Sequence, residues 1–188
     1  MSAAVLIAAV AACGGGGGSA KKKSAPTTTT AKPVVAPLTG LPDPGGLSLN
    51  RPALSVKVEN TPESRPQTGI DGADVVFEEV TEGDITRFMV VFNSAVPDVV
   101  GPVRSVRAVD ADLAAPLGGI FAYSGGAAPA VDLIRKVPSL NTVDETQAGS
   151  AMFRDKAKRA PHNLYGRGPD LFDKGGQPVP VKPLFTYL

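Results

Sequence analysis

A glycine-proline break followed by two arginines, Gly101-Pro102-Val103-Arg104-Ser105-Val106-Arg107, dominates the sequence. It comes after a turn-like segment, residues 81–84, and after an apolar run, residues 88–92, that opens at Arg87. Arginine is costly to bury without a partner, so arginines beside core strands require either carboxylates or an anionic ligand. Which of these two partners the arginines have is the main functional question that the sequence raises.

Three segments have the patterns of β-strands. Residues 54–59 alternate apolar and polar side chains with a period of two, as in a strand with one buried face. Residues 74–80 and 85–92 are two further strand-like runs, and the short connection between them predicts an antiparallel hairpin. The second run of this hairpin is almost continuously apolar, which indicates a central place in the sheet.

Two helices and a fourth strand follow. Residues 106–115 end at Pro116 and predict a short helix, residues 119–123 predict a strand, and residues 128–137 predict a second helix. Two glycines, at 125 and 126, separate this strand from the second helix and form either a tight turn or a weak anion site. The order of elements indicates an α/β fold of the α+β type: a single layered domain with a mixed sheet and short flanking helices.

The N-terminal region differs in composition from the rest. Residues 1–12 are apolar and end in small residues before Cys13, a pattern that resembles a bacterial lipoprotein signal peptide with its lipobox. The resemblance implies cleavage before Cys13, acylation of that cysteine with palmitate, and a membrane anchor in the cell envelope, on the extracytoplasmic face of the cell membrane. The apolar run is too short for a transmembrane helix, which needs about 20 residues.

The composition predicts four regions. They are a signal peptide at 1–12, a disordered Gly/Lys/Thr tether at 13–36, a folded domain at 37–177, and the start of a truncated second domain at 178–188.

The charge and the rare residue types exclude several classes of function. Four lysines precede residue 38, so the remainder carries 15 basic and 18 acidic residues, a net charge of −3. A net-acidic body argues against nucleic-acid binding, which needs a basic excess. With one histidine and one cysteine, a histidine- or thiolate-rich metal site is excluded, and we expect no metal and no cofactor. An all-carboxylate calcium or magnesium site stays open.

Two residues remain as candidates for acid/base catalysis, Glu78 and His162. Glu78 and Glu79 are neighbours on a predicted strand and therefore point to opposite faces, so only one of them could join a partner elsewhere. A serine triad would have to use His162, but no Gly-x-Ser-x-Gly motif surrounds a serine.

The arginines are the better candidates for ligand binding, because they lie in turns and at strand ends. The candidate binding residues are Arg65, Arg87, Arg104, Arg107, Arg154 and Asn163. An internal network of ion pairs would satisfy them equally well, with acids such as Asp74, Glu78, Glu82, Asp112 and Asp155. Five arginines that converge on one cleft would exceed these acids and leave some free for a phosphate, carboxylate or sulfate.

With these residues in view, residues 37–165 resemble the YerB-like bacterial lipoprotein family, a domain of unknown function (3048). The matching blocks are Pro37-Leu38-Thr39-Gly40, Arg51-Pro52, Glu59-Asn60-Thr61-Pro62, Arg65-Pro66-Gln67-Thr68-Gly69, Ala73-Asp74-Val75-Val76-Phe77-Glu78, Glu82-Gly83-Asp84-Ile85-Thr86-Arg87-Phe88, Gly101-Pro102-Val103-Arg104-Ser105-Val106-Arg107 and Ala160-Pro161-His162-Asn163-Leu164-Tyr165. The resemblance implies an envelope lipoprotein of unsettled activity, and a C-terminal domain that this chain lacks.

Two functional hypotheses remain. The first is a lipid-anchored module that binds an anionic small molecule, a cell-wall component or an envelope partner. The second is an envelope enzyme that acts on phosphate- or glycan-bearing wall material, with Glu78 or His162 as acid or base. Because no complete catalytic set is present, the first is favoured. We expect Arg87, Arg104 and Arg107 to share one cleft with His162 nearby, and Arg104 and Arg107 to share a helix face if the first helix begins at or before Arg104.

Overall fold

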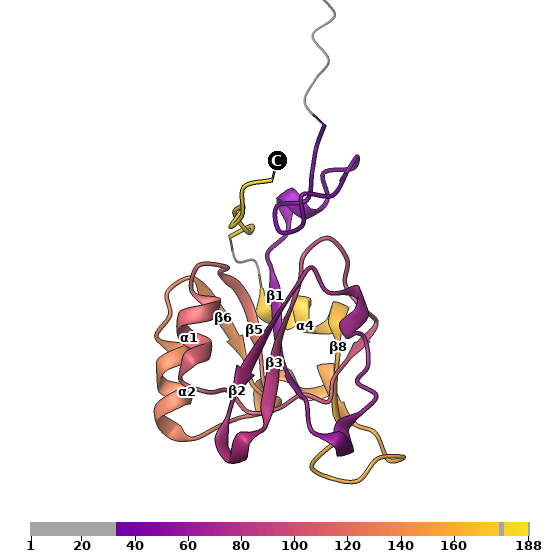
Figure 1. Cartoon of the computed structure of the whole chain (residues 1–188), viewed down its shortest axis with the longest axis vertical. Coiled ribbons are helices and arrows are strands. Elements are labelled where there is room, and N and C mark those ends of the chain that lie inside the picture. Colours follow the sequence, from indigo (N-terminus) through magenta and orange to yellow (C-terminus); the bar gives the residue numbers. More distant parts are fainter. Residues whose placement is uncertain (1–32, 177–178, 188) are drawn as a thin grey trace, which may run out of the picture. The chain divides into compact units, whose positions relative to one another are not determined.

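The main sheet has five strands in the order β2-β3-β1-β5-β6 (Figure 1). The computed structural model describes residues 33–176 and 179–187. The strands are β1 (Leu54–Glu59), β2 (Val75–Val80), β3 (Thr86–Phe92), β5 (Gly119–Ala122) and β6 (Leu140–Val143). β3 is antiparallel to both of its neighbours, whereas β5 is parallel to β1 and β6, so the sheet is mixed as predicted.

A second sheet has three short strands in the order β4-β8-β7. They are β4 (Val99–Val100), β7 (Met152–Arg154) and β8 (Leu164–Arg167), and both pairings are antiparallel. This sheet was not predicted, because strands of two to four residues are too short to show a periodic pattern.

Four helices and five 3₁₀ turns complete the described chain. The helices are α1 (Val109–Ala114), α2 (Ala128–Arg135), α3 (Glu145–Ala148) and α4 (Gly168–Gly175). The 3₁₀ turns are η1 (Ser48–Asn50), η2 (Pro62–Ser64), η3 (Ile70–Gly72), η4 (Glu82–Asp84) and η5 (Gly149–Ala151). Among the described residues, no helix has the length and apolar character needed to cross a membrane.

The main sheet is covered on both faces. Alternate residues of β1, from Leu54 to Val58, pack with Leu171 of α4 and Leu164 of β8 in one core cluster. Met89 and Phe121, on the other face, pack against α1 and α2 in a second cluster. Figure 1 shows α1 and α2 on one side of the sheet and α4 with β8 on the other. Both core clusters therefore have the middle strand β1 between them, with its side chains completely buried.

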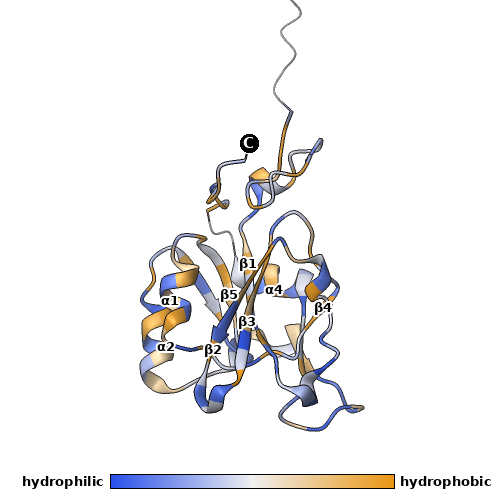
Figure 2. Cartoon of the chain, in the orientation of Figure 1, coloured by the Kyte–Doolittle hydropathy of each residue, from blue (hydrophilic) through white to orange (hydrophobic). Residues whose placement is uncertain are grey.

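The predicted strands and helices are found with small shifts. The first three strands match within one residue, the hairpin is antiparallel, and β3 lies inside the sheet. Figure 2 shows that hydrophilic residues gather at the hairpin end of β2 and β3, while their far ends are hydrophobic. The first helix begins at Val109, three residues later than predicted, and the N–H of Arg107, ahead of the helix, donates to the side-chain Oδ2 of Asp110.

Both ends of the described chain pack onto the fold. Residues 33–36 were placed in the tether, but Val35 bridges Pro42 and Ala36 is buried, because this stretch is apolar. Near the other end, Val181 is buried in the second core cluster. The predicted signal peptide, Cys13 and the remainder of the tether lie outside the described residues.

The parallel contact between β1 and β5 depends on a glycine. Gly119 has φ +86°, and a Cβ at this position would lie 2.3 Å from the carbonyl oxygen of Ala53. We therefore expect Gly119→Ala to lower the free energy of unfolding by at least about 2 kcal/mol, measured by urea denaturation. Gly72→Ala is the matched control, because nothing lies within 4 Å of its Cβ, and it should change stability by less than about 0.5 kcal/mol. Equal effects of the two substitutions would contradict the packing argument.

Candidate functional site

Two charged residues point from β1 into the interior. Lys57 and Glu59 are two positions apart, so both side chains lie on the face covered by α1, and both are completely buried. The alternating pattern of residues 54–59 predicts that both side chains face solvent. This prediction is wrong, because β1 is the middle strand and both of its faces are covered. The signal that could have identified them is the pair of opposite charges at alternate positions of an otherwise apolar strand.

Lys57 is the centre of a buried group of charges. Its Nζ lies 2.6 Å from Oε2 of Glu79 on β2 and 2.9 Å from Oδ1 of Asp110 on α1. One cation thus faces two carboxylates. Burial, followed by the nearby Asp110, raises the pKa of Glu79 from its ordinary 4.5 to about 7, against the opposing effect of Lys57.

Arg87 lies beside this group in the strand register. On β3 it is directly opposite Glu79 on one side and Glu59 on the other, which makes a row of three charged residues across the sheet. Its side chain is nevertheless outside salt-bridge distance of any carboxylate in the described chain. Its Nη1 donates instead to the carbonyl oxygen of Ser105, at 2.8 Å. Arg87 is only 6 % exposed. Burial lowers the pKa of Arg87, and the adjacent Arg107 and Arg104 lower it further.

The segment 101–107 continues the sheet where β5 stops. β5 pairs with β1 only as far as Val56. Beyond that point Val103 bridges Val58, and the N–H of Arg104 donates to the carbonyl oxygen of Lys57 at 2.9 Å. Gly101 fits here because a Cβ would lie 2.9 Å from the ring of Tyr165. The pairing brings the side chain of Arg104 next to the end of β1.

Arg107 turns toward the β2–β3 hairpin. Its Nε and Nη2 lie 2.9 and 2.8 Å from Oε2 of Glu82, and its Nη1 also donates to the carbonyl oxygen of Ser105 at 3.3 Å. The hydrogen bond from Arg107 lowers the pKa of Glu82. Glu82 itself is exposed, so water can replace this carboxylate at the guanidinium. We call Arg87, Arg104 and Arg107 the arginine cluster.

Glu59 joins the arginine cluster to the histidine. Its Oε1 lies 3.4 Å from Nε of Arg104 and accepts a hydrogen bond from the Thr61 hydroxyl at 3.2 Å. Its Oε2 lies 3.0 Å from Nδ1 of His162. Nη1 of Arg104 also donates to the carbonyl oxygen of Pro161 at 3.3 Å. This contact connects the cluster to residues 155–163, between β7 and β8, which we call the histidine loop.

Two surface hollows border these residues. The arginine hollow has a volume of about 520 Å³ and is lined by Glu82, Ser105, Val106, Arg107, Ala108, Gly126, Ala127, Pro129 and Ala130. The histidine hollow has a volume of about 360 Å³ and is lined by Glu63, Arg159, Ala160, Pro161 and His162. Of the three arginines expected to share one cleft, only Arg107 lines the arginine hollow, and His162 lines the other hollow.

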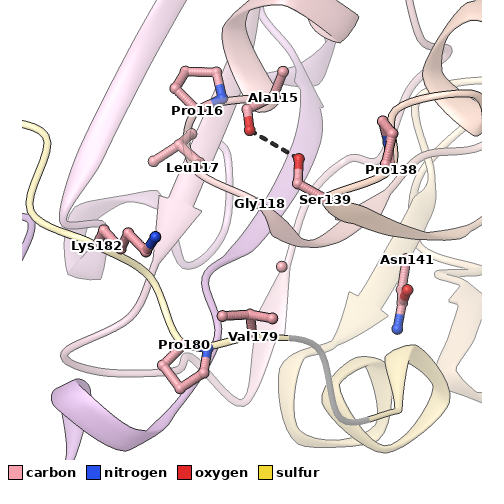
Figure 3. A pocket seen from close by; sticks show the side chains of 11 residues that line it. Ala115, Pro116, Leu117, Gly118, Pro138, Ser139, Asn141, Val179, Pro180 and Lys182 are labelled. Atoms are coloured by element: carbon pink, nitrogen blue, oxygen red, sulfur yellow. Dashed lines mark hydrogen bonds between the residues drawn. The ribbon is translucent and has the colours of Figure 1, made fainter.

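A third hollow, of about 500 Å³, lies between Pro116, Leu117, Ser139 and residues 179–182 (Figure 3). Ser139 uses its hydroxyl to donate to the carbonyl oxygen of Ala115 at 2.8 Å. Lys182 is the only charged side chain among the described residues that line it, and none of the predicted site residues does. We therefore centre the candidate site on the other two hollows.

The other predicted site residues have internal partners. Arg154 pairs with Glu145 at 2.8 Å and donates to Oδ1 of Asn163 at 3.0 Å. Arg65 is exposed and donates to Oδ1 of Asn60 at 3.1 Å. For Arg154, Asn163 and Arg65, partners within the protein therefore account for the observed contacts, and no ligand is needed to explain them.

Two further expectations concern residues of the hairpin and the first helix. Glu78 is exposed and accepts hydrogen bonds from Thr86 and Asn60, whereas Glu79 is buried, which confirms that the two neighbours face opposite ways. The condition under which Arg104 and Arg107 would share a helix face is not met, because α1 begins only after both of them.

The raised pKa of Glu79 predicts a pH dependence of stability. Because the folded pKa of about 7 exceeds the ordinary 4.5, this contribution to stability is complete below pH 4.5 and is lost as the pH rises through 7. Glu79→Gln has no titrating carboxylate at this position and should not lose this contribution. Between pH 4.5 and 8 the free energy of unfolding of the unmodified chain should therefore fall, relative to that of the variant, by up to about 3 kcal/mol. Urea denaturation across this range measures the difference.

The matched control is Glu78→Gln, which removes the same charge from the exposed face of the same strand. A Glu79→Gln variant whose stability ran parallel to that of the unmodified chain from pH 4.5 to 8 would contradict the assigned cause.

The fold and the site can now be compared with known proteins. Residues 38–177 match the family described as "Protein of unknown function (DUF3048) N-terminal domain". The chain is 38% identical over 137 residues to "Putative lipoprotein YerB" of Bacillus subtilis (strain 168), which covers 72% of this chain and 40% of that protein. It thus spans about two fifths of the length of this curated relative. The crystal structure of YerB from Bacillus subtilis is similar with a TM-score of 0.73 and 32% identity, over 81% of this chain and 54% of that one. The chain belongs to the DUF3048 family through its N-terminal domain, as its sequence blocks predicted.

Proposed function

We propose that this protein is anchored by a lipid on Cys13 at the extracytoplasmic face of the cell membrane and binds an anionic ligand in the arginine hollow. The anchor is supported by the apolar run before Cys13 and by the name of the relative, a lipoprotein. The ligand site is supported by the charges around Ser105.

The observation that carries the binding proposal is the position of Arg87. A buried guanidinium normally has a carboxylate partner, because its desolvation costs several kcal/mol. Arg87 is buried without one in the described chain and shares the Ser105 carbonyl oxygen with Arg107. Within the cluster, salt bridges join Glu59 to Arg104 and Glu82 to Arg107, which leaves Arg87 without a carboxylate at salt-bridge distance, although Glu59 and Glu79 lie opposite it in the strand register. An anion beside Arg107 and Arg87 would supply the missing partner.

The arginine hollow is the accessible side of this cluster. Arg107 presents its Nε and Nη2 edge, the edge that binds carboxylates and phosphates with two hydrogen bonds. The first turn of α2 forms the opposite wall, and its N-cap residue, Ala127, supplies no side-chain cap. The volume of about 520 Å³ suits a small organic anion. We infer a phosphate- or carboxylate-bearing ligand of metabolite size, or such a group on a wall polymer.

In this proposal Glu82 occupies the position of the ligand's anionic group when the hollow is empty. It is 74% exposed, so its removal should cost the fold little, while it competes directly for Arg107.

The enzyme hypothesis remains as the second candidate. Glu78 does not support it, because this side chain is occupied by Thr86 and Asn60 away from the hollows. His162 supports it better, because the carboxylate of Glu59 orients its ring. An envelope enzyme that acts on phosphate- or glycan-bearing wall material would use this histidine as its acid or base.

Substitution of the cluster tests the binding site. Arg107→Ala should weaken the binding of inorganic phosphate or of a sugar phosphate by about tenfold or more, since a charge-assisted pair is worth about 1.5–3 kcal/mol. Glu82→Gln should tighten it, and Asp84→Asn, in the same turn but without an arginine contact, should leave it unchanged. Isothermal titration of the three variants measures the affinities. Unfolding by Arg107→Ala, or equal effects of the two acidic substitutions, would show that the arginines are structural.

The anchor has a separate test. Cys13→Ser should block acylation and move the protein from the detergent phase and membrane fraction to the aqueous phase. Undiminished membrane association of this variant would contradict the lipid assignment.

A further inference from the structure

His162 and Glu59 form a carboxylate–imidazole pair outside the arginine hollow. The distance from Nδ1 of His162 to Oε2 of Glu59 is 3.0 Å. The glutamate side chain is 2% exposed and that of the histidine 23%. The acid is thus buried at the end of β1, while the imidazole reaches the surface at the histidine hollow.

The hydrogen-bond donors around Glu59 indicate which nitrogen of the imidazole carries the proton. Oε1 is faced by two donors, the Thr61 hydroxyl and Nε of Arg104. A carboxylate held in this way acts as an acceptor on its other oxygen as well, so Nδ1 of His162 carries the proton that it donates to Oε2. In the neutral ring Nε2 is then the nitrogen with the free lone pair.

Nε2 has no hydrogen-bond partner among the described residues, where the ring is bonded only through Nδ1. A carboxylate that orients one ring nitrogen and leaves the other free toward a substrate is the arrangement of a general base. It also occurs in metal sites, but in the described chain no group of three or more potential metal ligands includes this histidine.

The charges around the histidine hollow indicate the class of ligand. Glu63 and Arg159 line it with one charge of each sign, and Pro161 adds an apolar surface. This balance contrasts with the arginine cluster, in which Arg87 has no carboxylate partner within the described chain, and favours a neutral molecule with both donors and acceptors. Hydroxyl groups meet this requirement, and the volume of about 360 Å³ lies near the lower end for ligand pockets.

We propose that the histidine hollow is a binding site for a neutral hydroxyl compound of the sugar class, with His162 as the hydrogen-bond acceptor and Glu59 as its positioning residue. The ligand hydroxyl donates its hydrogen bond to Nε2. The buried carboxylate holds the ring in the tautomer that accepts this hydrogen bond. Arg159 and Glu63 bind neighbouring hydroxyl groups. This site is independent of anion binding in the arginine hollow.

The chain has one histidine, so each spectroscopic signal of an imidazole is assigned without ambiguity. In ¹⁵N spectra of the purified full chain above the titration of the ring, Nδ1 should be protonated and Nε2 unprotonated. The opposite tautomer in the unmodified chain would overturn the proposal, and this measurement needs no variant. Glu59→Gln should shift the ring toward a mixture of both tautomers.

Acylation by diethyl pyrocarbonate measures the free lone pair directly. Nε2 attacks a carbonyl carbon of the reagent. A bond forms between Nε2 and this carbon, the anhydride C–O bond breaks, monoethyl carbonate leaves, and the ring loses its Nδ1 proton. The rate, followed by the absorbance of the acylated imidazole, should fall about tenfold in a folded Glu59→Gln variant, as expected for loss of an orienting carboxylate. An unchanged rate would overturn the positioning role.

The ligand class has its own measurement. N,N′-Diacetylchitobiose, a neutral disaccharide referred to below as chitobiose, should move the His162 Nε2 resonance in a saturable way and slow its acylation, whereas inorganic phosphate should do neither. Arg159→Gln should weaken the chitobiose effect by at least about tenfold, while Arg65→Gln, which removes an arginine outside the hollow, should not. A response to phosphate alone, or to neither compound, would overturn the proposed ligand class. Failure of anion binding at Arg107 would leave all these outcomes unchanged.

Discussion

The burial of Lys57 and Glu59 on the middle strand is the constraint on which the rest of the arrangement depends. An ion in the protein interior loses several kcal/mol of hydration and must recover this from partners with good geometry. Neighbouring elements supply these partners. α1 and β2 each bring one carboxylate to Lys57, and the segment 101–107 and the histidine loop bring Arg104 and His162 to Glu59.

These ion pairs hold residues 104–110 at both ends. Arg104 is fixed to β1 by its backbone and to Glu59 by its side chain, and Asp110 is fixed to Lys57. Arg107 lies between these two points, with its N–H bonded to Oδ2 of Asp110 at 2.6 Å. Its side chain is therefore positioned at the hairpin end of the sheet before any ligand is present. Preorganisation of this kind reduces the entropy that binding would otherwise cost.

The two hollows differ in charge, and this difference separates their proposed roles. The arginine hollow borders a cluster in which Arg87 has no carboxylate at salt-bridge distance among the described residues, so it suits an anion. The histidine hollow has one charge of each sign and an oriented imidazole, so it suits neutral hydroxyl groups. Glu59 contacts both groups of residues, the arginine cluster through Arg104 and the histidine hollow through His162. A change at this residue would therefore affect both, while changes at Arg107 or Arg159 separate them.

The strands β1, β2, β3 and β5, the antiparallel hairpin and the mixed sheet could be predicted from the sequence, because they follow from periodicity and turn residues within a few positions. The sequence did not reveal the buried roles of Lys57 and Glu59, or the division of Arg107 and His162 between two hollows. Lys57 meets Asp110 across 53 residues of sequence, and Glu59 meets His162 across 103. Only the tertiary structure decided these contacts, because the cost of burying a charge depends on what covers the strand, and what covers β1 comes from distant parts of the chain.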